Sequence, residues 1–102
     1  DGRYVLKRLA QYNGFAEECN NKEILDAILL LAQTEGIFTE PAGGVSISVL
    51  QKMVEQGKID ANDKVVCYVT GNGLKATESI MEVLQKPKVM KANISEISAV
   101  VN

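Results

Sequence analysis

Apolar residues recur every three or four positions along much of the chain, which is the spacing of one face of a helix. The pattern predicts four helices, over residues 2–12, 20–36, 42–56 and 75–84. In the second of these, Asn20 and Glu23 have the spacing of a capping box, and Gly36 marks the end. A short fifth helix is expected after Asn93, where Asn93 and Glu96 repeat the cap pattern.

Runs that favour extended structure lie between the predicted helices. Residues 15–19 resemble an edge strand because they hold two adjacent glutamates, and residues 37–39 resemble a short buried strand. Residues 65–69 (Val-Val-Cys-Tyr-Val) show no polar alternation, which is typical of a strand covered on both faces of a parallel sheet. A further strand is predicted over residues 88–91. This order predicts an α/β fold class, with alternating strands and helices on a mainly parallel sheet.

Length and charge exclude several classes of protein. A chain of 102 residues has room for one domain. Its net charge of −2, without a run of Lys and Arg, excludes a nucleic-acid groove and disfavours an anionic membrane surface. The longest apolar run, residues 27–32 including Ile28 to Ala32, is far shorter than the ~20 residues of a membrane span, so no membrane partner is expected. Because no signal-peptide pattern is seen either, we expect a soluble, cytoplasmic protein.

The sequence contains no histidine, which removes the commonest general base and the commonest transition-metal ligand. A Ser-His-Asp or Cys-His catalyst is therefore excluded. Cys19 and Cys67 cannot complete a usual structural zinc site without histidine, so no metal is expected. Each cysteine lies in an apolar stretch, which favours two buried thiols, with a disulfide as the alternative.

Two glycine-rich turns are candidate ligand sites. Residues 42–44 (Ala-Gly-Gly) open a predicted helix, where free N–H groups could hold a phosphate, but the favoured interpretation is close packing at the helix start. Residues 70–75 (Thr-Gly-Asn-Gly-Leu-Lys) follow a predicted buried strand, at the place where α/β sheets expose their ligand sites. A plain turn with Thr70 as a helix cap explains the second motif equally well.

Three stretches resemble a known enzyme family. They are Asn-Lys-Glu-Ile-Leu at 21–25, Glu-Gly-Ile-Phe-Thr-Glu-Pro-Ala-Gly-Gly at 35–44, and Thr-Gly-Asn-Gly-Leu-Lys at 70–75. The Glu-Pro-Ala turn after Gly-Ile-Phe is shared by pyridoxal-phosphate enzymes of fold type II, whereas the third stretch is similar to threonine synthases in particular. The resemblance implies that residues 1–87 are the C-terminal segment of a pyridoxal-phosphate-binding domain, part of the larger domain of such an enzyme, and that residues 88–102 are a C-terminal tail.

The resemblance implies roles for the residues of the third stretch. Thr70 is the position whose hydroxyl meets the pyridine nitrogen of pyridoxal phosphate. A neutral hydroxyl suits this role because it does not force the ring nitrogen to stay protonated. Gly71 and Gly73 would let the backbone pass near the ring, and Asn72 would shape the turn.

At the other turn, Ala42 and Gly43 are similar to small residues that line the cofactor, while Glu40 is expected to order the turn. Lys75 does not stand in the context of the family's Schiff-base lysine, so it is not nominated. The resemblance therefore implies cofactor-binding residues in this chain but no catalytic residue.

The resemblance also implies the family's reaction, in which O-phosphohomoserine and water become threonine and phosphate. By the family pattern, the Schiff-base lysine and the glycine-rich phosphate loop precede the residues present, and the start at Asp1 fits a fragment. We therefore expect a chain that is inactive alone, that partners the N-terminal remainder of the same lyase, and that forms a homo-oligomer. The alternatives are a non-catalytic α/β binding or interaction module, and a sister fold-type-II lyase or dehydratase.

Overall fold

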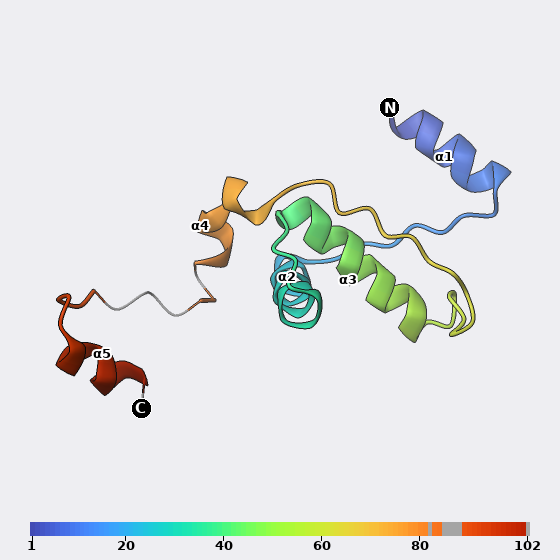
Figure 1. Cartoon of the computed structure of the whole chain (residues 1–102). Helices are drawn as coiled ribbons and strands as arrows, with labels where there is room; N and C mark the ends of the chain where they lie inside the picture. Colours follow the sequence, from blue (N-terminus) through green and yellow to red (C-terminus); the bar gives the residue numbers. More distant parts are fainter. Residues whose placement is uncertain (82, 85–88, 102) are drawn as a thin grey trace.

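The computed structural model describes residues 1–81, 83–84 and 89–101, and these residues form helices joined by irregular segments (Figure 1). The elements are α1 (Gly2–Gln11), α2 (Asn21–Glu35), α3 (Pro41–Glu55), the 3-10 helix η1 (Gly73–Lys75), α4 (Thr77–Ile80) and α5 (Ile94–Val101). α2 and α3 pack on each other, while α1 and α5 lie at opposite ends of the molecule. The first three predicted helices are therefore confirmed. In the described part of the chain, no helix combines the length and the apolarity needed to cross a bilayer.

The start and end of α2 are set by the residues that the sequence indicated. The side chain of Asn20 accepts a hydrogen bond from the N–H of Glu23 at 3.0 Å, and the Glu23 carboxylate accepts one from the N–H of Asn20 at 2.7 Å. At the other end, Gly36 has a φ of 68°, which a residue with a Cβ rarely adopts. The predicted capping box and glycine stop are confirmed.

The start of α3 is a tight turn built on backbone groups. Pro41 occupies the first helical position, where its missing N–H leaves no hydrogen bond unmade. The carbonyl of Glu40 accepts hydrogen bonds from the N–H groups of Gly43 and Gly44, at 3.0 and 3.2 Å. The helix ends two residues before Gly57, whose φ is 67°.

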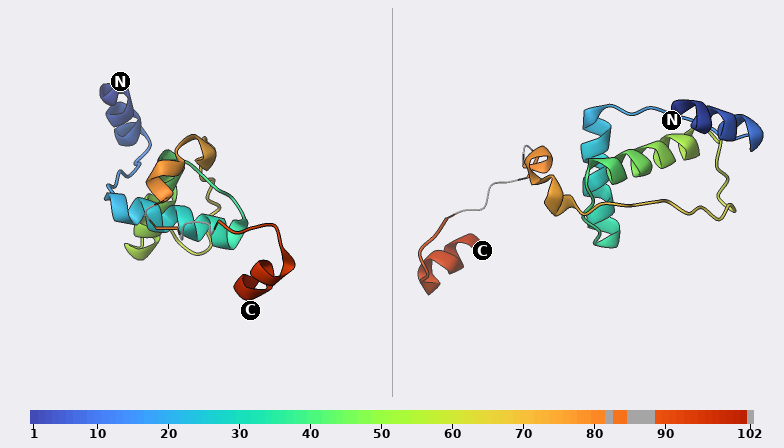
Figure 2. Two further views of the ribbon diagram at one scale, coloured as in Figure 1. Left: turned by 90° about the vertical axis from the view of Figure 1, so that its left-hand side faces the viewer. Right: turned by 90° about the horizontal axis from the view of Figure 1, so that it is seen from above.

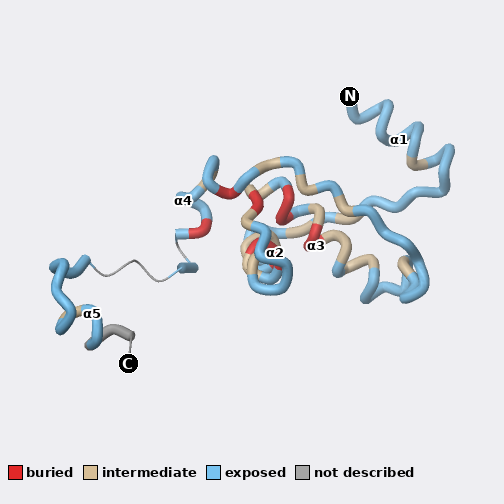
Figure 3. Tube along the Cα trace, in the orientation of Figure 1, coloured by how far each residue is buried: buried red, intermediate tan, exposed pale blue. Residues whose placement is uncertain are grey.

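The core lies between α2 and α3 (Figure 3). Ala27 and Leu31 of α2 pack with Ile47 of α3, and the half-buried Cys67 and Val69 cover this cluster. The two cysteines are free thiols, so the alternative of a disulfide between them is not realised.

The predicted parallel sheet is wrong. In the described residues, β pairing is limited to one antiparallel bridge, between Thr39 and Asn72. Residues 15–19 and 64–70 are irregular, and the view from above in Figure 2 shows them on opposite sides of α3. A strand forms only where a neighbouring strand accepts its backbone hydrogen bonds, and among the described residues neither segment has such a neighbour.

The Val-Val-Cys-Tyr-Val run shows what replaces the sheet. Val66 and Tyr68 are 81% and 78% exposed, whereas Cys67 and Val69 face the helical core. The run is thus covered on one face, not on both as the sequence suggested. Its continuous apolar character indicated burial correctly for alternate residues only.

The C-terminal part differs from the sequence prediction in one helix. In place of a helix over residues 75–84, η1 and α4 are separated by Ala76, whose φ of −143° and ψ of 46° are not helical.

The side chain of Asn93 accepts a hydrogen bond from the N–H of Glu96 at 2.9 Å, so the fifth helix and its cap are confirmed. Residues 89–91 form no strand, and residue 88 and the proposed domain boundary at residue 87 lie outside the described residues.

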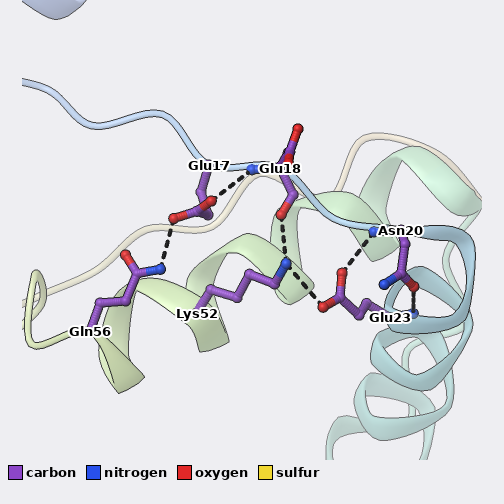
Figure 4. Close-up of polar contacts among 6 residues, drawn as sticks. All are labelled: Glu17, Glu18, Asn20, Glu23, Lys52 and Gln56. Carbon is purple, nitrogen blue, oxygen red and sulfur yellow. Dashed lines mark hydrogen bonds and ion pairs between the residues drawn. The ribbon is translucent and has the colours of Figure 1, made fainter.

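A polar network ties the segment before α2 to α3 (Figure 4). Lys52 Nζ donates to the carbonyl oxygen of Glu18 at 2.7 Å and lies 3.0 Å from Oε1 of Glu23. Nε2 of Gln56 donates to Oε2 of Glu17 at 2.8 Å. Side chains therefore hold this segment against the helix pair without a β-ladder.

This network makes stability depend on pH. The N–H of Asn20 and then the ammonium of Lys52 lower the pKa of Glu23 from its ordinary 4.5. A depressed carboxyl pKa stabilises the fold at pH values above 4.5, and this contribution is lost as the pH falls through the pKa of the folded state. The test is thermal unfolding between about pH 6 and about pH 3. We expect Glu23→Gln to have a lower Tm than the wild type at about pH 6, and its Tm to fall less than that of the wild type as the pH is lowered to about 3. The exposed Glu35→Gln is the control, and parallel curves for wild type and Glu23→Gln would contradict the assignment.

Candidate functional site

The segments that carry the two glycine-rich turns, residues 38–44 and residues 70–75, meet in the structure. The N–H of Glu40 donates to the carbonyl of Gly71 at 3.1 Å, and the N–H of Gly73 donates to the carbonyl of Phe38 at 3.0 Å. These two bonds form the antiparallel bridge between residues 39 and 72. The sequence singled out both turns, and the fold places them side by side at the start of α3.

Thr39 lies at the centre of this contact. It is 1% exposed, and its Oγ1 donates to the carbonyl oxygen of Gly71 at 3.0 Å. A Cβ built at Gly43 would overlap Oγ1 of Thr39, so the missing side chain at position 43 leaves the room that the hydroxyl occupies. Gly43 is buried, whereas its neighbour Ala42 is exposed.

Glu40 links the two turns through its side chain as well as its backbone. A Cβ at Gly71 would overlap the Glu40 carboxyl group, which therefore lies directly against the glycine. Nζ of Lys75 stands 3.4 Å from Oε2 of Glu40. Because the Lys75 side chain is 69% exposed, the ion pair adds little stability. Glu40 therefore contacts the second turn through its backbone, its carboxyl group and its ion pair.

The second turn is shaped by its own side chain and by an aromatic ring. Oδ1 of Asn72 accepts a hydrogen bond from the N–H of Leu74 at 2.9 Å and so caps η1. A Cβ at Gly73 would lie 2.6 Å from the ring of Phe38, a rigid neighbour. Asn72 therefore shapes the turn locally, and Gly73 permits a close approach to Phe38.

Thr70 ends the segment that runs over the core and is exposed. Its hydroxyl is a neutral group that both donates and accepts, which suits a heteroaromatic ring nitrogen in either protonation state. The bridge fixes the Gly71–Asn72 peptide unit, so the turn that follows this hydroxyl is held in place. The chemistry of this hydroxyl is compatible with the pyridine side of pyridoxal phosphate, and the contact itself stays a prediction.

Sequence reasoning missed the residues that join the turns. Phe38, Thr39 and Lys75 belong to the stretches that carry the resemblance, but no sequence pattern assigned them a part in joining the two turns. The available signal was the spacing of Thr39 and Gly43, four residues apart around a helix start, where a small residue leaves space for a side chain. The partner turn, however, is more than 30 residues away in sequence, and no local pattern reveals it.

Comparison with known proteins shows the family. A family model described as pyridoxal-phosphate dependent enzyme matches residues 1–71. The chain is 36% identical to a threonine synthase of Methanocaldococcus jannaschii over 94% of its own length and 24% of that protein. It is 43% identical to a threonine synthase of Halalkalibacterium halodurans over 79% of its own length and 23% of that protein. It is 39% identical to a threonine synthase of Methanosarcina acetivorans over 91% of its own length and 23% of that protein.

The chain thus spans about a quarter of the length of the curated relatives it matches. The resemblance drawn from the three motifs is confirmed, and so is the cofactor class, which the family description names. This chain belongs to the pyridoxal-phosphate-dependent enzyme family and is similar to threonine synthases.

Proposed function

We propose that this chain is the C-terminal portion of a threonine synthase, a lyase that converts O-phosphohomoserine and water to threonine and phosphate. The observation that carries the proposal is the match with the Methanocaldococcus threonine synthase, which covers 96 residues. A match of that length includes both turns, the same two segments that the bridge holds together.

The chain would supply the pyridine-nitrogen side of the cofactor site. Thr70 would bond the ring nitrogen, and the bound cofactor would supply the electron sink that the reaction needs. A neutral partner at this nitrogen keeps the sink mild because it does not enforce protonation. Gly71 and Asn72 would carry the backbone past the ring, with Ala42 and Gly43 beside it.

The chain alone would be inactive. Lys75, the one lysine of the two turns, pairs with Glu40, which agrees with its having no covalent role toward the cofactor. Large apolar side chains are exposed, Val66 and Tyr68 among them, which favours the remainder of the same protein, and further copies of it, as partners that cover them. The cytoplasmic location stays a prediction.

The reaction is tested on the full-length enzyme with O-phosphohomoserine as substrate. We expect release of inorganic phosphate together with threonine. Release of pyruvate or 2-oxobutyrate from hydroxyamino acids, without phosphate release, would identify a sister dehydratase instead. A full-length protein that does not bind pyridoxal phosphate would favour the non-catalytic module.

The role of Thr70 is tested by Thr70→Val, which keeps the shape of the side chain and removes its hydroxyl. We expect an altered cofactor absorption spectrum and a roughly tenfold lower turnover, the effect of about 1.4 kcal/mol of lost hydrogen bonding. Thr34→Val, at an exposed position of α2, is the matched control. A spectrum and a rate equal to those of the wild type would end the assignment.

A further inference from the structure

The carbonyl oxygen of Gly71 receives two hydrogen bonds from the opposite turn. The N–H of Glu40 donates at 3.1 Å and the hydroxyl of Thr39 donates at 3.0 Å. A carbonyl oxygen has two lone pairs, so both are used here. The Gly71–Asn72 peptide unit, the second one after Thr70, is therefore fixed in orientation by two donors, one of which is a side chain.

The Thr39 hydroxyl has a single strong partner. The carbonyl of Glu40 lies 3.3 Å from Oγ1, but that group belongs to the adjacent residue, and the Gly71 oxygen is nearer. The side chain is 1% exposed, so water does not compete for the hydroxyl. The absent side chain of Gly43 provides the space in which the hydroxyl sits.

We propose that Thr39 is a positioning residue for the cofactor, because its hydroxyl orients the Gly71–Asn72 peptide and thereby the turn that carries the hydroxyl of Thr70. The inference rests on the proposed role of Thr70 at the pyridine nitrogen. Thr39 itself does not touch the cofactor in this scheme. It acts through the carbonyl of Gly71, one residue after Thr70.

The proposal separates the hydroxyl of Thr39 from the volume of its side chain. Thr39→Val keeps the volume and removes the donor, whereas Thr39→Ser keeps the donor and removes a methyl group. A residue that only fills space would tolerate valine better than serine. A positioning residue shows the reverse order in any property that reports on the cofactor.

The experiment uses the full-length enzyme and three readouts. These are the Tm of the protein without cofactor, the Kd of pyridoxal phosphate by absorbance titration, and the absorption spectrum at saturating cofactor. For Thr39→Val we expect Kd to rise roughly three- to tenfold, the effect of one buried hydrogen bond, and the spectrum to change in the same direction as for Thr70→Val. For Thr39→Ser we expect a wild-type spectrum and a Kd within about twofold of wild type.

The outcomes distinguish the proposed role of Thr39 from the proposed role of Thr70. If Thr70→Val alters the spectrum and Thr39→Val does not, the inference about Thr39 fails while the role of Thr70 stands. If neither variant alters it, both assignments fail. A lower Tm for Thr39→Val with unchanged Kd and spectrum would make the hydroxyl merely structural and overturn the inference. Thr39→Ala, which adds no atoms, repeats the test if the valine variant yields little folded protein.

Discussion

Gly44→Leu is expected to lower the free energy of unfolding by about 3 kcal/mol, because α2 and α3 approach too closely at this position for a side chain. A Cβ at Gly44 would lie 2.8 Å from Cγ1 of Ile28 and 2.9 Å from the carbonyl oxygen of Ile24. The first neighbour could change its rotamer, but the second is backbone of α2 and can move only with its helix. The substitution would therefore separate the two helices that enclose the core.

Replacing Gly44 also has a stabilising effect, but this effect is smaller than the cost of overpacking. Replacing a helical glycine gains about 0.5–1 kcal/mol from the restricted unfolded chain, well below the expected cost of overpacking. Urea or thermal unfolding measures the difference in the free energy of unfolding between the variant and the wild type. Val45→Leu, at the next position of α3 and 38% exposed, is the matched control and should change stability by less than about 0.5 kcal/mol. A Gly44→Leu protein as stable as this control would contradict the close contact.

Gly43→Ala is expected to weaken both the fold and the cofactor site. The new methyl group would take the place of the Thr39 hydroxyl, at a cost of about 1–3 kcal/mol in unfolding free energy. Displacing that hydroxyl would also free the carbonyl of Gly71, so the Kd of pyridoxal phosphate should rise. The Tm of the protein without cofactor and the Kd measure the two effects separately.

Ala42→Leu provides the comparison for Gly43→Ala. Ala42 is exposed, so leucine fits without displacing a neighbour and the Tm without cofactor should stay unchanged. A rise in Kd for Ala42→Leu alone would favour the predicted lining of the cofactor by residue 42. If Gly43→Ala raised Kd and left the Tm without cofactor at the wild-type value, residue 43 would line the cofactor and would not act through packing against Thr39.

The helices could be predicted because their signals are local. The Asn20 and Glu23 pair and Gly36 each act within one turn of the backbone, and the structure contains them as expected. The apolar spacing of α2 and α3 indicated helices that pack through one face, and Ala27, Leu31 and Ile47 form the core between them.

The sheet could not be predicted correctly because a strand depends on a neighbour, which a run of β-favouring residues does not specify. The Val65–Val69 run is apolar for a different reason. Its alternate residues Cys67 and Val69 cover the helix pair, while Val66 and Tyr68 remain exposed. Continuous apolar character was therefore a sound indication of contact with the core and a poor one of strand pairing.

The candidate site was predictable in its parts and not in its assembly. The turns at 42–44 and 70–75 are unusual in composition and similar to a family, so they stood out in the sequence. Their meeting depends on Thr39 and Gly71, which no spacing rule connects. The cofactor contacts of Thr70 and of the residues around it stay predictions until the variants above are measured.

The bond between Thr39 and Gly71 also has a consequence for the order in which the chain assembles. The two residues are 32 positions apart, and closing a loop of that length costs about 3 kcal/mol of chain entropy. The turns of α2 and α3 close over three or four residues and form without that cost. The bridge is therefore expected to form late in folding and to open before the helix pair separates, so amide hydrogens of the bridge, such as that of Gly73, should exchange with solvent ahead of those in the middle of α2.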